Sequence, residues 1–336
     1  MHPTAHPHEP INLMSHLWQF FFKQFLPVGL VIAALVGFLA PAPGLFMASL
    51  PTQYIAVSII FICSGLTLRT DEIKAALSSW TATAWGSASI LFITPLIGTL
   101  IAFQLPLDRS FQLGLALFCC MPTTLSSGLA LTAQARGNVA LALLLTVLTN
   151  TVGIVTVPFV LALLLASLGQ VELSAQALLV KLCFSILLPL AVGKYLRRWV
   201  HAWVDRNRVH LTMTSNAALI SIPWMKFSES SDRLAQIALS SLLILVVSGL
   251  AIHVFFLLLN DGAARLLKLA LPLRKAMVLL ASQKTLPVAM TVLAFLPEES
   301  VSAELKGLIA IPCITFHLGQ IFLDAFIATR WAANAA

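Results

Sequence analysis

Two long apolar segments of this chain are each interrupted by a short polar run that contains a proline. The first run lies within residues 117–129, LFCCMPTTLSSGL, and the second within residues 278–289, VLLASQKTLPVA. A helix that faces lipid cannot leave its backbone groups unpaired, so such interruptions persist only where protein or a water-filled cavity surrounds them. They therefore predict a polar site inside a membrane protein, formed where two helices are broken.

The composition supports this reading of the chain as a membrane protein. Of its 336 residues, 59% are hydrophobic and only 10% are charged, and the mean hydropathy is +0.94. A soluble domain needs far more polar surface than this. The net charge of +7 is explained by Lys and Arg in cytoplasmic loops, so no nucleic-acid partner is implied. We expect an integral, multi-pass protein that is embedded in the lipid bilayer.

Several classes of function lack their sequence signatures. The five cysteines lie in apolar stretches without the Cys and His spacing of a metal site, so they are predicted to be reduced core residues. The chain contains no HExxH, GxSxG or P-loop motif and no paired intramembrane aspartates. We therefore expect neither an enzyme nor an ATP-driven pump.

Ten segments are predicted to form membrane-spanning helices, which need roughly 20 residues each. They cover residues 25–44, 53–68, 81–103, 112–134, 139–166, 176–196, 211–226, 237–259, 276–296 and 306–329. The second segment is short, and the seventh is both short and polar. Residues 1–22 have the residue order of neither a signal peptide nor a transit peptide, and we predict a disordered tail there.

The basic residues predict how these ten segments are oriented. Fourteen of the 20 Lys and Arg residues fall on the side of the N-terminus, five fall on the other side, and Lys284 lies inside a segment. Because Lys and Arg accumulate in cytoplasmic loops, both termini are predicted to be cytoplasmic. A bacterial inner membrane is the expected location.

The two halves of the chain then have opposite topology. Helices 1–5 lie within residues 23–170 and helices 6–10 within residues 171–336, and the interrupted helix is the fourth of each half. This pattern is typical of secondary transporters built from inverted repeats. A single domain without a repeat is the alternative, because the halves share almost no residue identity.

The first interruption offers hydroxyl groups around a proline. Pro122 removes a backbone donor and disfavours helix at the preceding residue. The helix that resumes after it presents unpaired N–H groups, which suits an anion. The hydroxyl groups belong to Thr123, Thr124, Ser126 and Ser127. The alternative is a simple proline kink in which these hydroxyls satisfy the freed carbonyls.

The second interruption contains the one Lys or Arg that the ten-helix arrangement leaves deep in a segment. Its polar residues and proline are Ser282, Gln283, Lys284, Thr285 and Pro287. An ionisable group at that depth costs a few kcal/mol, so it marks a candidate functional site. Lys284 is predicted either to bind an anionic substrate or to lose a proton during the transport cycle. A lysine that reaches the membrane interface is the alternative.

Two further helices place polar side chains on one face. Thr146 and Asn150 are four residues apart, and His317, Gln320 and Asp324 follow at the spacing of a single stripe. We predict that Thr146, Asn150, His317 and Gln320 belong to the site. The alternatives are interhelical hydrogen bonds, a His317 satisfied by a carbonyl, and an Asp324 that pairs with a basic loop.

The motifs together resemble a known family. FICSGLTLRT at residues 61–70, CCMPTTLSSGLALT at 119–132, GNVALAL at 137–143 and SQKTLPV at 282–288 are similar to the bile acid:sodium symporter-like family, nearest to its plant plastid sodium/metabolite branch and bacterial relatives. The resemblance implies ten helices in a five-plus-five fold. Helices 1, 2, 6 and 7 would form a panel, helices 3–5 and 8–10 a core, with broken helices 4 and 9 crossing in the core.

The resemblance also implies candidate sodium ligands, with departures from the family pattern. Ser126, Ser127, Thr146 and Gln283 correspond to cation-binding positions, whereas a second hydroxyl position is Ala142 and no acidic residue occurs between residues 276 and 296. An ammonium in place of a carboxylate repels a cation. We therefore predict that Lys284 takes the place of a bound cation, in a carrier that is sodium-independent or proton-linked.

These observations predict a secondary transporter that moves a small organic anion by alternating access. The anion would be bile acid-like or a metabolite carboxylate or sulfonate, and the only cofactor that the resemblance implies is a sodium ion. The alternative function is a membrane regulator of ion homeostasis that moves no organic solute. The sequence leaves the oligomeric state open.

Overall fold

The computed structural model describes residues 25–68, 79–124, 127–167, 174–296 and 301–333. Within these ranges the chain is helical and contains no strand, which confirms the all-α prediction. The predicted tail of residues 1–22, the candidate ligand Ser126 and the predicted boundary between residues 170 and 171 lie outside the described residues.

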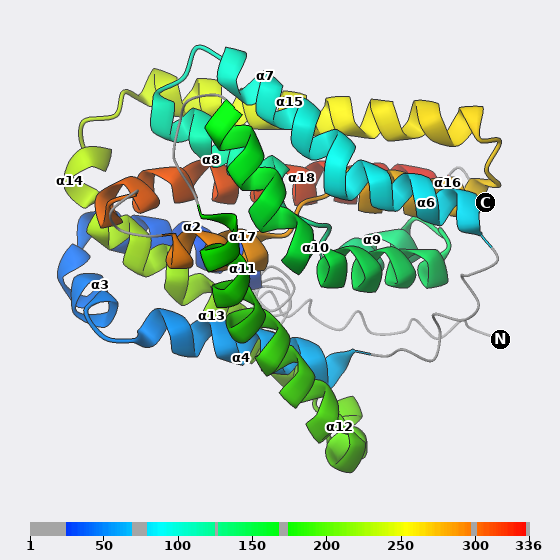
Figure 1. The fold of residues 1–336 in the computed structure, drawn as a ribbon, viewed down its shortest axis with the longest axis horizontal. Helices are drawn as coiled ribbons and strands as arrows, with labels where there is room; N and C mark the ends of the chain where they lie inside the picture. Colours follow the sequence, from blue (N-terminus) through cyan, green and yellow to red (C-terminus); the bar gives the residue numbers. More distant parts are fainter. Residues whose placement is uncertain (1–24, 69–78, 125–126, 168–173, 297–300, 334–336) are drawn as a thin grey trace, which may run out of the picture.

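Figure 1 shows the order and arrangement of the helices. Before residue 168 they are α2 Phe25–Leu39, α3 Pro41–Ala48, α4 Thr52–Thr67, α6 Trp80–Ala88, η1 Ser89–Ile93, α7 Thr94–Gln104, α8 Arg109–Cys119, α9 Ser127–Gln134 and α10 Val139–Ser167. After residue 173 they are α11 Ala175–Leu182, η2 Cys183–Leu187, α12 Leu188–Arg206, α13 Arg208–Glu229, α14 Ser231–Leu234, α15 Leu239–Leu266, α16 Leu271–Ser282, α17 Leu286–Phe295 and α18 Ala303–Ala333.

Six of the described helices are long and apolar enough to cross a membrane, or seven if one bent pair is counted as a single span. The six are Trp80–Gln104, Val139–Leu163, Ala175–Arg206, Leu239–Leu266, Leu271–Phe295 and Ala303–Ala333. Helix α4 is shorter at 16 residues, α8 and α9 are separate helices, and α13 is long but more polar. The count of ten spans therefore stays a prediction.

The first predicted span differs from expectation because it is not one straight helix. Helices α2 and α3 meet at an angle of 100° around Ala40. Ala40 precedes Pro41, and a residue before proline is disfavoured in the helical region. Pro41 and Pro43 also lack the N–H groups that would continue the backbone hydrogen bonds of α2. The local sequence therefore explains the bend.

Two helices contain a wider, π-helical turn directly before a proline. The turn η1 joins α6 to α7 just ahead of Pro95, and η2 joins α11 to α12 just ahead of Pro189. A proline inside a helix removes one donor and crowds the preceding turn, so the helix widens there. The widened turn leaves backbone carbonyls that need another donor.

The described helices pack in two groups. One group contains α2, α3, α4, α12 and α13. Within it, α13 contacts α2, α3 and α4, and α12 packs along α4. Helices α7, α8, α15, α16, α17 and α18 form most of the other, and α13 meets α18 between the groups. In Figure 1, α4 and α15 lie on opposite sides of the view with α16, α17 and α18 between them.

Candidate functional site

Both predicted helix breaks are present. Helix α8 ends at Cys119 and α9 begins at Ser127, while α16 ends at Ser282 and α17 begins at Leu286. In the second break, Gln283 and Thr285 have extended backbones with ψ of 150° and 124°. Pro287 occupies the first turn of α17, where its missing N–H costs nothing.

The two breaks contact each other directly. The backbone N–H of Thr285 donates to the carbonyl of Pro122 at 2.9 Å, and the hydroxyl of Thr123 donates to the carbonyl of Leu280 at 2.5 Å. A third bond runs from the Thr124 hydroxyl to Gln283 Oε1 at 2.6 Å. Backbone groups released by each break are thus paired by the other break, as burial away from water requires.

Helix α10 holds the first break from the side. The Asn150 amide donates to the carbonyl of Thr123 at 3.0 Å and to the carbonyl of Thr146 at 2.8 Å. The Thr146 hydroxyl is 3.4 Å from the carbonyl of Thr124. The predicted pair on α10 therefore lies against the break, and the Oδ1 atom of Asn150 is buried without a hydrogen-bond partner.

Lys284 is fully buried and turned toward η1. Its Nζ donates to the carbonyl of Ile90 at 3.0 Å and to the Thr94 hydroxyl at 2.8 Å. The ammonium thus supplies the donor that the π-helical turn needs. Lys226, Lys275 and Lys306 are also buried, so Lys284 is not alone among the basic residues in being shielded from solvent.

On α18, Gln320 bonds to the backbone of the second break and His317 bonds to Gln320. Gln320 Oε1 accepts the backbone N–H of Lys284 at 2.9 Å and Gln320 Nε2 donates to the Lys284 carbonyl at 2.6 Å, which fixes the amide orientation. The same Nε2 lies 3.0 Å from His317 Nδ1 and therefore donates to it. A neutral His317 then carries its proton on Nε2, an atom that is buried without a partner.

Within the described residues Asp324 bonds to two buried side chains and not to a basic loop, so that alternative was wrong. It is fully buried, and its Oδ2 accepts a hydrogen bond from Gln283 Nε2 at 2.6 Å. Its Oδ1 is 2.8 Å from Nε2 of His253, a fully buried residue of α15. The sequence reasoning did not single out His253, because a lone histidine on an apolar helix carries no signal of which helix lies opposite.

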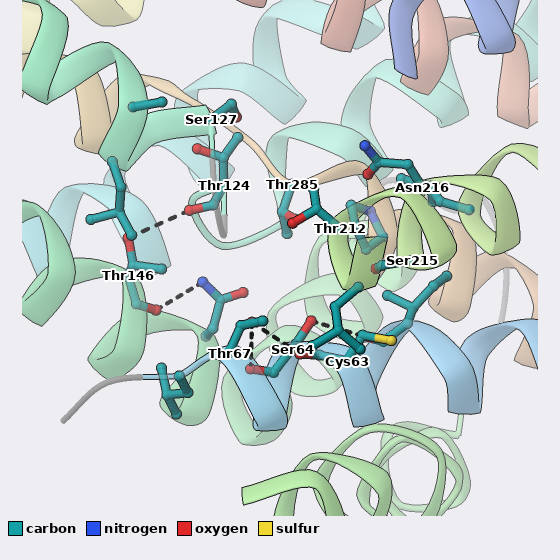
Figure 2. Close-up of a pocket in the computed structure, with 18 of the residues that line it drawn as sticks. Cys63, Ser64, Thr67, Thr124, Ser127, Thr146, Thr212, Ser215, Asn216 and Thr285 are labelled. Atoms are coloured by element: carbon teal, nitrogen blue, oxygen red, sulfur yellow. Dashed lines mark hydrogen bonds between the residues drawn. The ribbon is translucent and has the colours of Figure 1, made fainter. Parts of the chain in front are cut away.

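A cavity of about 810 Å³ lies beside the first break, between the two groups of helices. Figure 2 shows Thr124, Ser127 and Thr146 on one side of it, Thr212, Ser215 and Asn216 on another, and Cys63, Ser64 and Thr67 below. Its apolar wall includes Phe25, Leu26, Ile60, Leu143 and Leu219. The buried polar atoms of the lining that have no hydrogen-bond partner among the described residues include Asn150 Oδ1, Thr285 Oγ1 and His317 Nε2.

The cavity separates the predicted site residues into two sets. Those that line it are Thr124, Ser127, Thr146, Asn150, Thr285, Pro287 and His317. Those that lie behind the lining and hold the breaks are Pro122, Thr123, Ser282, Gln283, Lys284 and Gln320. Most of the second polar run therefore lies behind the cavity lining.

Arg208 was missed by the sequence reasoning. It is the one lining residue with a permanent charge in the part of the chain that the structure describes. Its guanidinium donates to the carbonyl of Thr67 at 3.0 Å and lies 3.4 Å from Asp205. In the sequence, arginines near helix ends indicate only the orientation of the helices, and nothing local marks this one as facing a cavity.

Comparison with known proteins gives a consistent result. A family model described as the SBF-like CPA transporter family matches residues 24–333. The chain is 35% identical to a probable sodium/metabolite cotransporter, BASS4, of rice chloroplasts (Oryza sativa subsp. indica), over 95% of this chain and 78% of that protein. It is 26% identical to the putative symporter YfeH of Escherichia coli, over 82% of each chain, and 26% identical to the mouse sodium/bile acid cotransporter 7, over 91% of each.

Proposed function

This chain belongs to the SBF-like CPA transporter family, and from that premise we propose that it is a sodium-coupled secondary transporter of an organic anion. The observation that carries the proposal is the cavity that reaches both helix breaks, Thr124 in the first and Thr285 in the second. Broken helices that meet beside a polar cavity are the arrangement in which secondary transporters bind substrate and coupling ion.

We also propose that the chain forms ten membrane-spanning helices in two inverted repeats. Helices occupy all ten predicted segments within the described residues, and the breaks fall in the fourth segment of each half. The grouping of α2, α3, α4, α12 and α13 against the remaining helices supports a panel and a core. Alternating access would then be a movement of one group against the other around the cavity. We place both termini on the cytoplasmic side, in a bacterial inner membrane, with the relative in E. coli as support.

An anionic substrate is supported by the donors that face the cavity. Arg208 supplies a permanent positive charge, and the tautomer that Gln320 imposes on His317 leaves an Nε2–H group without an acceptor. Thr285 adds a hydroxyl that has no partner. A carboxylate or sulfonate accepts hydrogen bonds from all three kinds of donor, while the apolar wall suits a hydrocarbon body.

Sodium coupling, in place of the sodium-independent or proton-linked carrier predicted from the sequence, is supported by two of the relatives, which are named as sodium cotransporters. Oxygen atoms that could receive the ion lie on the cavity side of the first break, where Ser127, Thr146 and Asn150 Oδ1 line the cavity. We propose that Lys284 acts as a tethered cation that fills one position behind the break permanently. Its Nζ is directed to Ile90 and Thr94, so the geometry does not support direct contact with a substrate in the cavity.

Uptake into proteoliposomes tests the proposed function. Purified protein would be offered radiolabelled taurocholate, pyruvate, malate and 2-oxoglutarate, with an inward gradient of sodium chloride or of choline chloride. We expect one class of acid to accumulate with sodium and the accumulation to collapse when a sodium ionophore is added. Equal accumulation with choline would refute sodium coupling and favour the sodium-independent carrier. Absence of uptake for every acid would favour a regulator that moves no solute, which the names of the relatives do not support.

Arg208→Gln is expected to raise the KM for the acid about tenfold or more, because a hydrogen bond to a charged group contributes about 1.5–3 kcal/mol. The maximal rate should change little. Arg197→Gln is the matched control, since Arg197 also bonds to the end of α4, at the carbonyl of Leu66, and to Asp205 but does not line the cavity. Initial-rate uptake at varied acid concentration gives both constants. Equal KM values in the two variants would assign Arg208 a structural role only.

A further inference from the structure

A chain of buried hydrogen bonds leads from the cavity to a histidine and aspartate that the proposed function does not use. Thr124 donates to Gln283 Oε1 at 2.6 Å, Gln283 Nε2 donates to Asp324 Oδ2 at 2.6 Å, and Asp324 Oδ1 lies 2.8 Å from His253 Nε2. None of these side chains is more than 3% exposed. The chain joins the first break, the second break, α18 and α15.

The chain leaves the Gln283 amide a single orientation. An ionised carboxylate only accepts hydrogen bonds, so the side of Gln283 that faces Asp324 must be its NH₂ group. The carbonyl oxygen must then face Thr124, whose hydroxyl donates to it. With its hydrogen used in this way, the Thr124 oxygen accepts the backbone N–H of Gly128 at 3.0 Å, in the first turn of α9. The orientation of the Gln283 amide that Asp324 requires thus determines the hydrogen bonding at the start of α9.

A buried carboxylate is costly unless other groups compensate it, and in a membrane protein it marks a functional position. Here the described partners of Asp324 are one amide and one imidazole. His253 bonds through Nε2, while its Nδ1 is buried without a partner. His253 therefore holds Asp324, and Asp324 holds Gln283.

We propose that His253 and Asp324 are a positioning pair for the crossing of the two breaks. The pair orients the Gln283 amide, and through it the Thr124 hydroxyl that faces the cavity. The residues do not touch the substrate. If the protein is a sodium-coupled transporter, the pair also determines how the coupling ion is bound at the first break. Only this consequence rests on the proposed function. The positioning itself is a property of the resting protein and can be measured without transport.

Hydrogen–deuterium exchange of the purified protein tests the positioning. Asp324→Ala should accelerate exchange about tenfold in peptides that cover residues 279–288 and 127–134, because a buried donor left without its acceptor costs roughly 1–3 kcal/mol. Asp324→Asn should restore protection, since its Oδ1 can still accept from Gln283 and its NH₂ can donate to His253 Nε2 when the neutral imidazole carries its proton on Nδ1. Asp261→Asn is the control: this carboxylate lies on α15 with His253, but it bonds to Arg265 and Arg274.

A double-mutant cycle identifies the route of the effect. If Asp324 acts through Gln283, then Asp324→Ala should add little exchange in a Gln283→Ala background, because residues in one network are not additive. Acceleration spread over all helices, equal effects of Asp324→Ala and Asp324→Asn, or additive effects in the double mutant would each overturn the proposal.

The transport consequence has its own readout. In uptake assays, Asp324→Ala should raise the sodium concentration for half-maximal rate about tenfold, while the KM for the acid at saturating sodium changes less than about twofold. Asp324→Asn should restore the sodium response. If wild-type uptake ignores sodium, the sodium part of the proposed function fails, and the exchange experiment still decides the positioning role. If the acid KM rises and the sodium response does not, the assigned consequence is wrong.

Discussion

Lys284→Met is expected to abolish accumulation of substrate and to lower the thermal midpoint of the purified protein. Methionine has a similar length but cannot donate, so the carbonyl of Ile90 in η1 loses the donor that lies 3.0 Å from it. The Thr94 hydroxyl loses a donor at 2.8 Å as well. Each buried group left unsatisfied costs about 1–3 kcal/mol. Lys284→Glu should be worse, because an unpaired buried charge costs about 3–5 kcal/mol.

The control for this prediction is a lysine that makes the same kind of hydrogen bond but is not buried. Lys181 also donates from Nζ to a backbone carbonyl, that of Phe295 at 3.3 Å, but Lys181 is exposed. Lys181→Met should therefore leave the thermal midpoint and uptake nearly unchanged. Thermal unfolding in detergent and uptake of the identified acid are the two measurements. An unchanged midpoint together with a raised KM in Lys284→Met would mean that the ammonium contacts substrate, against the tethered-cation proposal.

Gly193→Leu is expected to prevent α12 from packing on α4 and to abolish recovery of monodisperse protein. A Cβ at Gly193 would lie 2.2 Å from the carbonyl oxygen of Ile62, and a Cβ at Gly65 would lie 2.2 Å from that of Leu190. The two glycines therefore let the helix backbones touch, as small residues do at helix interfaces in membranes. Backbone atoms cannot rotate away, so the cost should exceed the about 1–3 kcal/mol of ordinary overpacking.

A glycine without close neighbours provides the comparison. A Cβ at Gly262, in α15, would meet no atom within 4 Å. Gly262→Leu should fold normally and should even be slightly more stable, because glycine in a helix costs up to about 1 kcal/mol relative to a good helix former. Size-exclusion chromatography and thermal unfolding distinguish the two variants. Equal behaviour of Gly193→Leu and Gly262→Leu would contradict the close approach of α4 and α12.

Local sequence was sufficient wherever a feature depends on a residue's own backbone. The polar runs around Pro122 and Pro287 predicted both breaks, since proline lacks a donor and the polar neighbours can pair in the interior. The bend at Ala40 and the widened turns before Pro95 and Pro189 were not predicted, but they follow from the same chemistry. The long apolar segments predicted an all-helical membrane protein for a similarly local reason.

What each polar side chain faces was decided only by the tertiary structure. Periodicity predicted that His317, Gln320 and Asp324 share one face of α18, but it could not show that Gln283 and His253 lie opposite Asp324. Nor could it show that Lys284 turns away from the cavity while Arg208 turns toward it.

The physical reason for this division is the range of the interactions. A helix, a kink or a break is determined by groups within about four residues along the chain. The hydrogen bonds that make the site join different helices, and some of them join residues more than 100 positions apart, such as Thr124 with Gln283 and Lys284 with Ile90. The sequence by itself determined where the helices break, and only the packing of the helices decided which groups meet at the breaks.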